Sequence, residues 1–296
     1  MASARPGSDP ALAALLPVWA GDVRIAYGEV PTTFPDSIGR GVLYDVSSSA
    51  LLLEIPDIAR LHIARDAIVV APLITDAAAA LGPHLRRTPL MALTLLRGGF
   101  ACCGAAVAGP DGAVLLLGAT GTGKSTLAAA LMQRGLRLLA DDAAPLVLDE
   151  GGNAKVRPVW PELILWHDAV RALFGEAPPW LQSSDGEIPI REVTRAHFCA
   201  DDMPLKGIYV LSPDRLEDDI SHSTVRGFGR LLNSLLIPYQ TEIAVALLDP
   251  TVLLRLYGAV SAIAGTHTLK LLQRDVNEMN ALAERIMQDC GWLSAT

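Results

Sequence analysis

One stretch of the chain matches the pattern G-x-x-x-x-G-K-[ST] at every position: Gly118, Ala119, Thr120, Gly121, Thr122, Gly123, Lys124 and Ser125. Glycines in such a loop let backbone N–H groups turn toward a phosphate, and a helix that begins at the loop adds the positive end of its dipole. The lysine of this pattern neutralises the β- and γ-phosphates, and the serine hydroxyl is a ligand of Mg²⁺. We therefore predict that this loop, together with Thr126, binds ATP and that Ser125 binds Mg²⁺.

Two adjacent carboxylates follow the loop. Asp141 lies 17 residues after Lys124, and Asp142 is the next residue, directly after the apolar stretch at 136–140. One carboxylate at a strand end can hold a metal ion while the other accepts a proton from an attacking hydroxyl. We predict that Asp141, Asp142 and Lys124 are the catalytic residues, and the residues alone leave open which carboxylate takes which role. The structural alternative is an Asp pair that only caps the following turn.

The residues around the loop predict the elements that would position it. The apolar run 113–117 should be a strand that leads into the loop, and the spacing of leucines after the loop predicts a helix over 125–134 that Gly135 ends. Two small apolar runs flank residues 110–112, which have the sequence Pro-Asp-Gly. This pattern predicts an antiparallel strand pair joined by a tight turn.

Further elements are expected on both sides of this core. Residues 22–73 alternate short apolar runs with Gly, Pro, Ser and Asp, which is typical of a small β-rich region. The pattern at 88–97 predicts a helix with Thr88 as its N-cap. Beyond the carboxylates we expect a hairpin about the glycines at 151–152 and a helix over 161–175 that its last glycine closes.

The overall composition narrows the class of protein. The chain has 296 residues, 51% apolar content and a formal charge of −8, with Lys and Arg scattered along it. This charge and the scattered basic residues argue against a polyanion-binding surface, so we expect no nucleic acid partner. No apolar run is long enough to span a membrane, and the N-terminal stretch lacks the core of a signal peptide, so the expected compartment is the cytoplasm. The four cysteines at 102, 103, 199 and 290 match neither a zinc ligand set nor a disulfide framework.

The loop with its continuation KSTLAAALMQRGLRLLADD, the interval from lysine to the Asp pair, and the antiparallel pair before the loop resemble the HPr kinase/phosphorylase superfamily. The nucleotide-binding core of that superfamily is related to that of phosphoenolpyruvate carboxykinase. The segments LMALTLLRGGF before the core and RPVWPELILWHDAVRALFG after it are similar to the smaller HPr kinase-like members. The resemblance implies an α/β fold with a P-loop core of this type and a small β-rich N-terminal region. It divides the chain into a tail at 1–20, the β-rich region at 21–87 and a P-loop kinase domain at 88–296.

The resemblance also implies a function, namely an ATP- and Mg²⁺-dependent serine kinase that acts on a peptide or protein. Carried over by position, it implies that Asp141 is the metal ligand and Asp142 the catalytic base. Some similar proteins are encoded with biosynthetic systems for ribosomally made peptides, and lasso-peptide members phosphorylate a serine of their precursor peptide. The implied partner is therefore a peptide or protein substrate that carries a serine. We expect neither nucleic acid nor a membrane as a partner, and a homo-oligomer is possible. The segment associated with phosphorolysis is missing, so no reverse phosphorylase activity is expected.

The chain departs from the family pattern at Cys103, where a histidine is expected upstream of the loop. A thiol with an ordinary pKa of about 8.5 is a poor replacement for imidazole as a proton partner at neutral pH. This departure favours one alternative, a catalytically silent nucleotide-binding regulatory protein. The other alternative is a small-molecule kinase. Arg157, Arg226 and Arg230 are candidates for phosphate contacts, with ordinary surface positions as the alternative reading.

Overall fold

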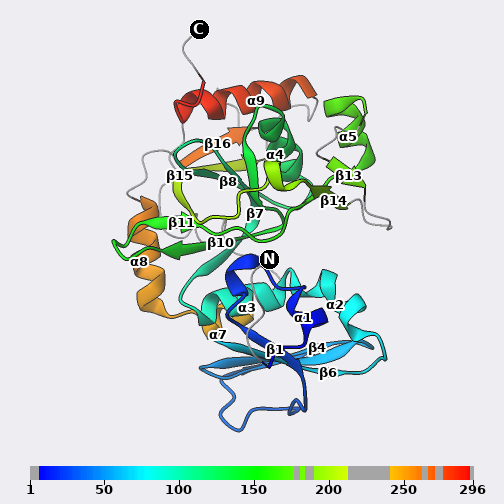
Figure 1. Cartoon of the computed structure of the whole chain (residues 1–296). Coiled ribbons are helices and arrows are strands. Elements are labelled where there is room, and N and C mark those ends of the chain that lie inside the picture. Colours follow the sequence, from blue (N-terminus) through cyan, green and yellow to red (C-terminus); the bar gives the residue numbers. More distant parts are fainter. Residues whose placement is uncertain are drawn as a thin grey trace. The chain divides into compact units, whose positions relative to one another are not determined.

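A computed structural model describes residues 7–176, 181–183, 190–212, 241–261, 266–270 and 276–293 (Figure 1). The chain forms two compact units, unit 1 with residues 1–101 and 236–255, and unit 2 with residues 102–235 and 256–296. Both units combine helices with a β-sheet, so the protein has a mixed α/β fold.

Unit 1 contains a six-stranded sheet in the order β1-β6-β5-β4-β3-β2. The strands are β1 (Arg24–Tyr27), β2 (Gly39–Arg40), β3 (Tyr44–Val46), β4 (Ala50–Ile55), β5 (Ala59–Ala64) and β6 (Ala67–Pro72). β1 is parallel to β6, and the other neighbours are antiparallel. Alternate residues of β5 are buried, because successive side chains of a strand point to opposite faces. The strands expected between residues 22 and 73 are confirmed.

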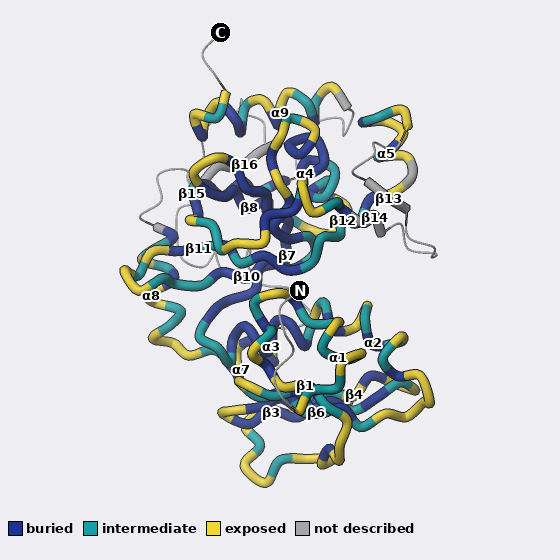
Figure 2. The backbone as a smooth tube through the Cα atoms, in the orientation of Figure 1, coloured by how far each residue is buried: buried dark blue, intermediate teal, exposed yellow. Residues whose placement is uncertain are grey.

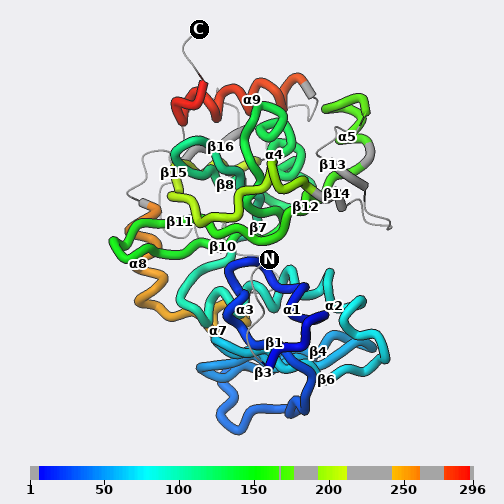
Figure 3. Tube along the Cα trace, viewed as in Figure 1, coloured from blue at the N-terminus to red at the C-terminus, as the bar shows by residue number. Residues whose placement is uncertain are grey.

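The helical segments of unit 1 are α1 (Pro10–Ala13), η1 (Val18–Ala20), α2 (Ala77–Leu85), α3 (Thr88–Leu96) and α7 (Thr241–Leu247). α3 packs on β4 and β5. α7, which is distant in sequence, packs against α3, β2 and β3 (Figure 3). The helix expected at 88–97 is confirmed, but Thr88 as its N-cap is wrong. Thr88 is the first residue of α3, and Arg87 is the N-cap. Only Arg86 and Arg87 separate α3 from the end of α2 at Leu85, so the cap falls on one of these two residues.

Unit 2 is built on a seven-stranded sheet in the order β10-β11-β15-β8-β7-β9, with β16 beside β15 and a further pairing of β10 with β7. Its strands are β7 (Phe100–Ala108), β8 (Ala113–Leu117), β9 (Arg137–Ala140), β10 (Ala143–Leu148), β11 (Ala154–Val156), β15 (Met203–Ser212) and β16 (Thr266–Lys270). A separate three-stranded sheet contains β12 (Glu162–Ile164), β13 (Leu181–Ser183) and β14 (Ile190–Val193).

The strand connections expected around the loop are confirmed. β7 and β8 are antiparallel, and the Gly109 N–H donates to the Gly112 carbonyl across their turn at 2.8 Å. β10 and β11 also form an antiparallel hairpin about the glycines at 151–152. The prediction of a single helix over 161–175 is wrong for its first part, because residues 162–164 form the strand β12. The second part of the prediction corresponds to a helix over 167–174. Leu163 and Leu165 are buried and alternate with less buried neighbours, and this period of two suits a strand.

The helical segments of unit 2 are α4 (Lys124–Gln133), α5 (His167–Phe174), η2 (Arg195–His197) and α9 (Val276–Asp289), and α8 (Pro250–Ser261) spans the boundary between the units. The helix expected over 125–134 is confirmed as α4, and Gly135 ends it with a φ of 93°. α4 packs between the sheet and α9, and β7 and β8 are almost entirely buried beneath it (Figure 2). Arg134 fixes the two helices to each other through hydrogen bonds to Asn280 and Glu284 of α9. In the described ranges no helix has the length and apolar content needed to cross a membrane.

Candidate functional site

The glycine loop at 118–125 connects the end of β8 to the start of α4 (Figure 1). Gly118 has a φ of 145°, and a Cβ there would lie 2.6 Å from the Leu211 carbonyl oxygen. Gly123 is the N-cap of α4 with a φ of 93°. Both positions need glycine, because other residues are strained at such φ values. The Thr122 hydroxyl and N–H both donate to the Ala119 carbonyl, at 2.8 and 3.2 Å, and close the loop on itself.

Lys124 lies beneath this loop with only 9% of its surface exposed. Its Nζ donates to the carbonyl oxygens of Gly118 at 2.9 Å and Ala119 at 3.0 Å. An ammonium group has three donors. Within the described part of the chain these two bonds use two of them, so one remains for an anion. Because Ala119, Thr120 and Gly121 are exposed, the outer side of the loop is open to solvent.

Ser125 and Asp141 meet directly. The Ser125 hydroxyl in the first turn of α4 donates to Asp141 Oδ1 at 2.8 Å, and the Ile164 N–H donates to Oδ2 at 2.7 Å. Burial raises the pKa of the Asp141 carboxyl to about 6, and the Asp142 charge acts in the same direction, although both hydrogen bonds oppose the change. The hydroxyl and the carboxylate are hard oxygen donors of the kind that Mg²⁺ prefers, so the residues fit this ion.

Asp142 is held in an unusual backbone conformation. Its φ is 67°, and the Ala143 N–H donates to the Asp141 carbonyl at 2.8 Å, so Asp142 is the central residue of a γ-turn with positive φ. Such turns are rare and strained, and backbone strain of this kind gathers at functional sites. The Asp142 carbonyl accepts a hydrogen bond from the Gly104 N–H of β7 at 3.2 Å, which attaches the turn to the sheet.

The sheet topology brings the loop and the carboxylates to the same edge. β7 is antiparallel to both β8 and β9, with Gly104 opposite Leu117 and Ala106 opposite Ala140. β8 and β9 therefore run in the same direction on either side of β7, and the segments after their carboxyl ends lie at one edge. Cys103 is half-buried on β7, next to Gly104. The position at which the family resemblance implies a histidine is thus on the strand between the loop and the Asp pair.

The remaining sequence candidates have different surroundings. Thr126 is half-buried in the first turn of α4, next to Ser125. Arg157 donates from Nε and Nη2 to the Asp202 carboxylate at 3.0 to 3.2 Å, so this carboxylate balances its charge. Arg226 and Arg230 lie outside the described residues.

Sequence reasoning missed two participants, the N–H groups of Ile164 and Gly104. Backbone donors leave no side-chain signal. Only the pairing of distant segments brings the Ile164 N–H to the Asp141 carboxylate and the Gly104 N–H to the Asp142 backbone carbonyl. In the described ranges no group of three or more His, Cys, Asp and Glu side chains could hold a metal ion. A pair of oxygen ligands suits Mg²⁺ none the less, because this ion usually keeps several waters and binds substrate phosphates.

No family model matches the sequence, and no curated protein matches it. Among solved structures, the Hpr(Ser) kinase/phosphatase from Coxiella burnetii is similar, with a TM-score of 0.33 and 12% sequence identity over 64% of this chain and 98% of that chain. A likeness of this extent says nothing about which residues act, so the chemistry of the site follows from its own side chains.

Proposed function

We propose that this protein is an ATP- and Mg²⁺-dependent kinase that phosphorylates a serine of a peptide or protein. The observation that carries the proposal is the 2.8 Å hydrogen bond from Ser125 to Asp141 beside a glycine loop that encloses Lys124. In this proposal the core of unit 2 is a P-loop core of the HPr kinase type, as the sequence resemblance implies.

The loop would bind the triphosphate of ATP. Its positive φ values at 118, 121 and 123 turn the backbone as a phosphate cradle requires, and α4 begins there with the positive end of its dipole. Lys124 supplies a buried positive charge with a free donor. Because Lys124 is buried, water screens its charge less than that of a surface lysine, so it would stabilise the phosphates more.

Ser125 and Asp141 would hold Mg²⁺, and the remaining ligands would be water and phosphate oxygens. The bound ion would supply positive charge to the transferred phosphoryl group. The Ile164 N–H orients the Asp141 carboxylate from its other oxygen, so the carboxylate is positioned before the ion binds.

Asp142 would act on the acceptor. Its carboxylate takes the proton of the serine hydroxyl as the hydroxyl oxygen forms a bond to the γ-phosphorus, and the bond from that phosphorus to the β–γ bridging oxygen breaks. The products are phosphoserine and ADP. The strained turn would keep the Asp142 side chain in one orientation, and correct orientation is a large part of phosphoryl-transfer catalysis.

The acceptor would be a peptide or protein that carries a serine. The resemblance to HPr kinase-like proteins of peptide biosynthesis makes the precursor peptide of a ribosomally made product, such as a lasso peptide, the first acceptor to test. Cys103 favours a second candidate function, a nucleotide-binding protein without turnover, because the implied histidine is absent. A small-molecule kinase is the third candidate.

Calorimetric titration with Mg²⁺ and ATP tests the nucleotide site. The wild type should bind, Lys124→Ala should not, and Lys155→Ala on β11 is the matched control for loss of a positive charge. ADP formation is then measured with and without a serine-centred peptide library, and phosphoserine is sought by mass spectrometry. ATP binding without ADP or phosphopeptide would favour the silent protein, and ADP formed only with a metabolite panel would favour a small-molecule kinase. Absence of ATP binding would refute the proposal.

A further inference from the structure

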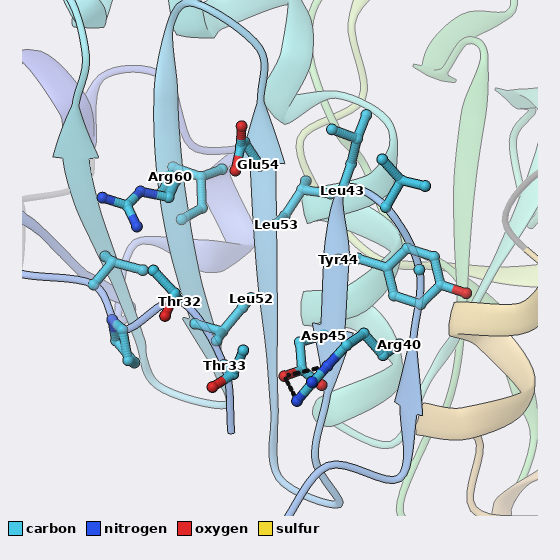
Figure 4. Close-up of a pocket in the computed structure, with 15 residues that line it drawn as sticks. Thr32, Thr33, Arg40, Leu43, Tyr44, Asp45, Leu52, Leu53, Glu54 and Arg60 are labelled. Carbon is cyan, nitrogen blue, oxygen red and sulfur yellow. Dashed lines mark hydrogen bonds and ion pairs between the residues drawn. The ribbon is translucent and has the colours of Figure 1, made fainter. Parts of the chain in front are cut away.

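Unit 1 contains a groove of about 220 Å³ on its six-stranded sheet (Figure 4). Side chains of β4 and β5 form its floor, and its walls are the loop at 30–33 and the β2–β3 hairpin at 40–45. In the register of these strands Leu52 lies opposite His62, and Glu54 lies opposite Arg60. These four side chains therefore share one face of the sheet, opposite to the face of Leu61. The groove lies far in sequence from the loop and the Asp pair.

One buried carboxylate fixes both walls. Asp45 is 3% exposed, and it accepts hydrogen bonds from the Phe34 N–H at 2.8 Å, from the Ser37 hydroxyl and from Arg40 Nη2 at 2.8 Å. The Phe34 ring also packs edge-on against His62, with ring centres 5.7 Å apart. These contacts connect the chain segment after the loop at 30–33 to the hairpin wall and to the floor of the groove. The walls are therefore held in place without a ligand, so the groove is preorganised for binding.

Two opposite charges line the floor without pairing. Glu54 and Arg60 are direct cross-strand neighbours, a position at which a carboxylate and a guanidinium usually attract each other. Within the described ranges neither side chain makes a hydrogen bond or an ion pair, and their charged ends point apart (Figure 4). Glu54 is exposed and Arg60 half-buried. Both groups are available to a ligand.

Two apolar side chains of the hairpin wall are exposed to solvent. Val42 is 99% exposed and Leu43 is 41% exposed, and both line the groove. Exposed apolar residues that border a groove with polar groups are typical of sites for protein or peptide partners.

We propose that this groove docks an extended peptide segment in which an acidic and a basic residue stand beside an apolar one. The acidic residue pairs with Arg60, the basic residue with Glu54, and the apolar residue covers Val42 and Leu43. The volume is below the range of about 300 Å³ and upward that holds a whole drug-sized ligand, so the groove holds a few side chains of a longer chain. The balanced charges argue against nucleic acid and anionic membrane surfaces, both of which need clustered positive charge.

The inference does not depend on phosphoryl transfer. If the proposed kinase function holds, the docked segment is a part of the acceptor peptide away from its serine, and docking there raises the local concentration of that serine. If the protein is catalytically silent, the same groove still binds its peptide.

The test uses the full chain without ATP. A phage-displayed library of random dodecapeptides is selected on the wild type, and the enriched peptides are synthesised and titrated by calorimetry. Arg60→Ala, Glu54→Ala and Val42→Asp should each weaken binding about tenfold or more. Arg24→Ala, which removes an exposed arginine of the same sheet outside the groove, should leave the Kd unchanged. Thermal unfolding checks that each variant is folded.

Charge reversal gives a second, independent readout. The double variant Glu54→Arg with Arg60→Glu should lose the selected peptides and bind versions in which the acidic and basic residues are exchanged. Unchanged Kd values in the groove variants, or no enriched peptide, would overturn the inference. Complete competition by a free amino acid would also overturn it, because the groove would then be a small-molecule site. A wild type that binds these peptides but never consumes ATP would refute the proposed function and leave this inference standing.

Discussion

The Asp141 carboxyl is in an environment that disfavours its charged form, and this should lower the free energy of unfolding by a measurable amount. Burial raises the pKa of its carboxyl to about 6 in the metal-free protein, against an ordinary value of 3.8. The folded state therefore binds this proton more tightly than the unfolded state. Below about pH 4 both states are protonated and the group costs no stability. As the pH rises from 4 to 6 the folded protein is progressively destabilised, and above 6 the whole cost is present.

The magnitude follows from the two pKa values. A difference of about 2 corresponds to about 3 kcal/mol, at 1.36 kcal/mol for each pKa unit. Because Asp141 is only half-buried, solvent screens part of this effect, and we expect about 2 kcal/mol. Asp141→Asn removes the charge and keeps a side-chain oxygen that can accept one of the two hydrogen bonds from Ser125 and Ile164.

Urea unfolding in EDTA at pH values from 4 to 7 measures this effect. Relative to the wild type, Asp141→Asn should gain about 2 kcal/mol in free energy of unfolding between pH 4 and pH 7. Added Mg²⁺ should stabilise the wild type at pH 7, because it binds the folded state, and should have little effect on the variant. Both results together would show that the Asp141 charge lowers the stability of the fold and that Asp141 binds Mg²⁺, as proposed.

Asp149→Asn is the matched control, since this partly exposed hairpin carboxylate accepts a hydrogen bond from the Asn153 N–H at 2.8 Å, which lowers its pKa. The pH dependence of this control should have the opposite sign and lie mostly below pH 4. A stability difference between Asp141→Asn and the wild type that does not change with pH would refute the reasoning about burial.

Four further predictions concern the same site. Lys124→Ala should lower phosphoryl transfer about a hundredfold or more, measured as the initial rate of ADP formation, because a buried charge at the phosphates is lost; near-normal turnover would contradict the phosphate-binding loop. Asp142→Asn should keep calorimetric ATP binding and lose most transfer, while Asp142→Gly should relieve the positive φ of 67° and raise the unfolding free energy by about 1 kcal/mol. Equal melting temperatures for Asp142→Gly and the wild type would argue against strain at this turn. Cys103→Ala should keep most activity, and Cys103→His should raise it or move its pH optimum toward about 6.5, as a pH–rate profile would show. Gly118→Ala should destabilise the fold by about 1 to 3 kcal/mol in urea unfolding, because its Cβ would lie 2.6 Å from the Leu211 carbonyl oxygen.

Local patterns predicted the loop and its neighbours well. β8, the turn at 110–112 and α4 with its end at Gly135 all lie where the sequence indicated. Each depends on residues within a few positions of one another, such as an apolar run, a Pro-Asp-Gly turn or a glycine at positive φ. Ser125 and Asp141, the two predicted Mg²⁺ ligands, follow strands β8 and β9 in sequence, and a hydrogen bond of 2.8 Å joins their side chains.

Local reasoning failed where a distant segment decides the structure. Residues 162–164 were expected in a helix, yet they form β12, whose partner β14 begins at Ile190. α7 was not foreseen as part of unit 1, although it packs there on β2, β3 and α3. In both cases the partner lies well outside the window in which periodicity can be detected.

The sequence by itself determined the chemical groups of this site: a loop with glycines at the required positions, a lysine, a serine and two carboxylates in order. Only the tertiary structure decided that β7 stands between β8 and β9 and that the Ile164 N–H orients Asp141. The physical reason is that side-chain chemistry and local periodicity depend only on residues that are close in sequence. Strand order and backbone hydrogen bonds, in contrast, depend on which distant segments bury their apolar faces together.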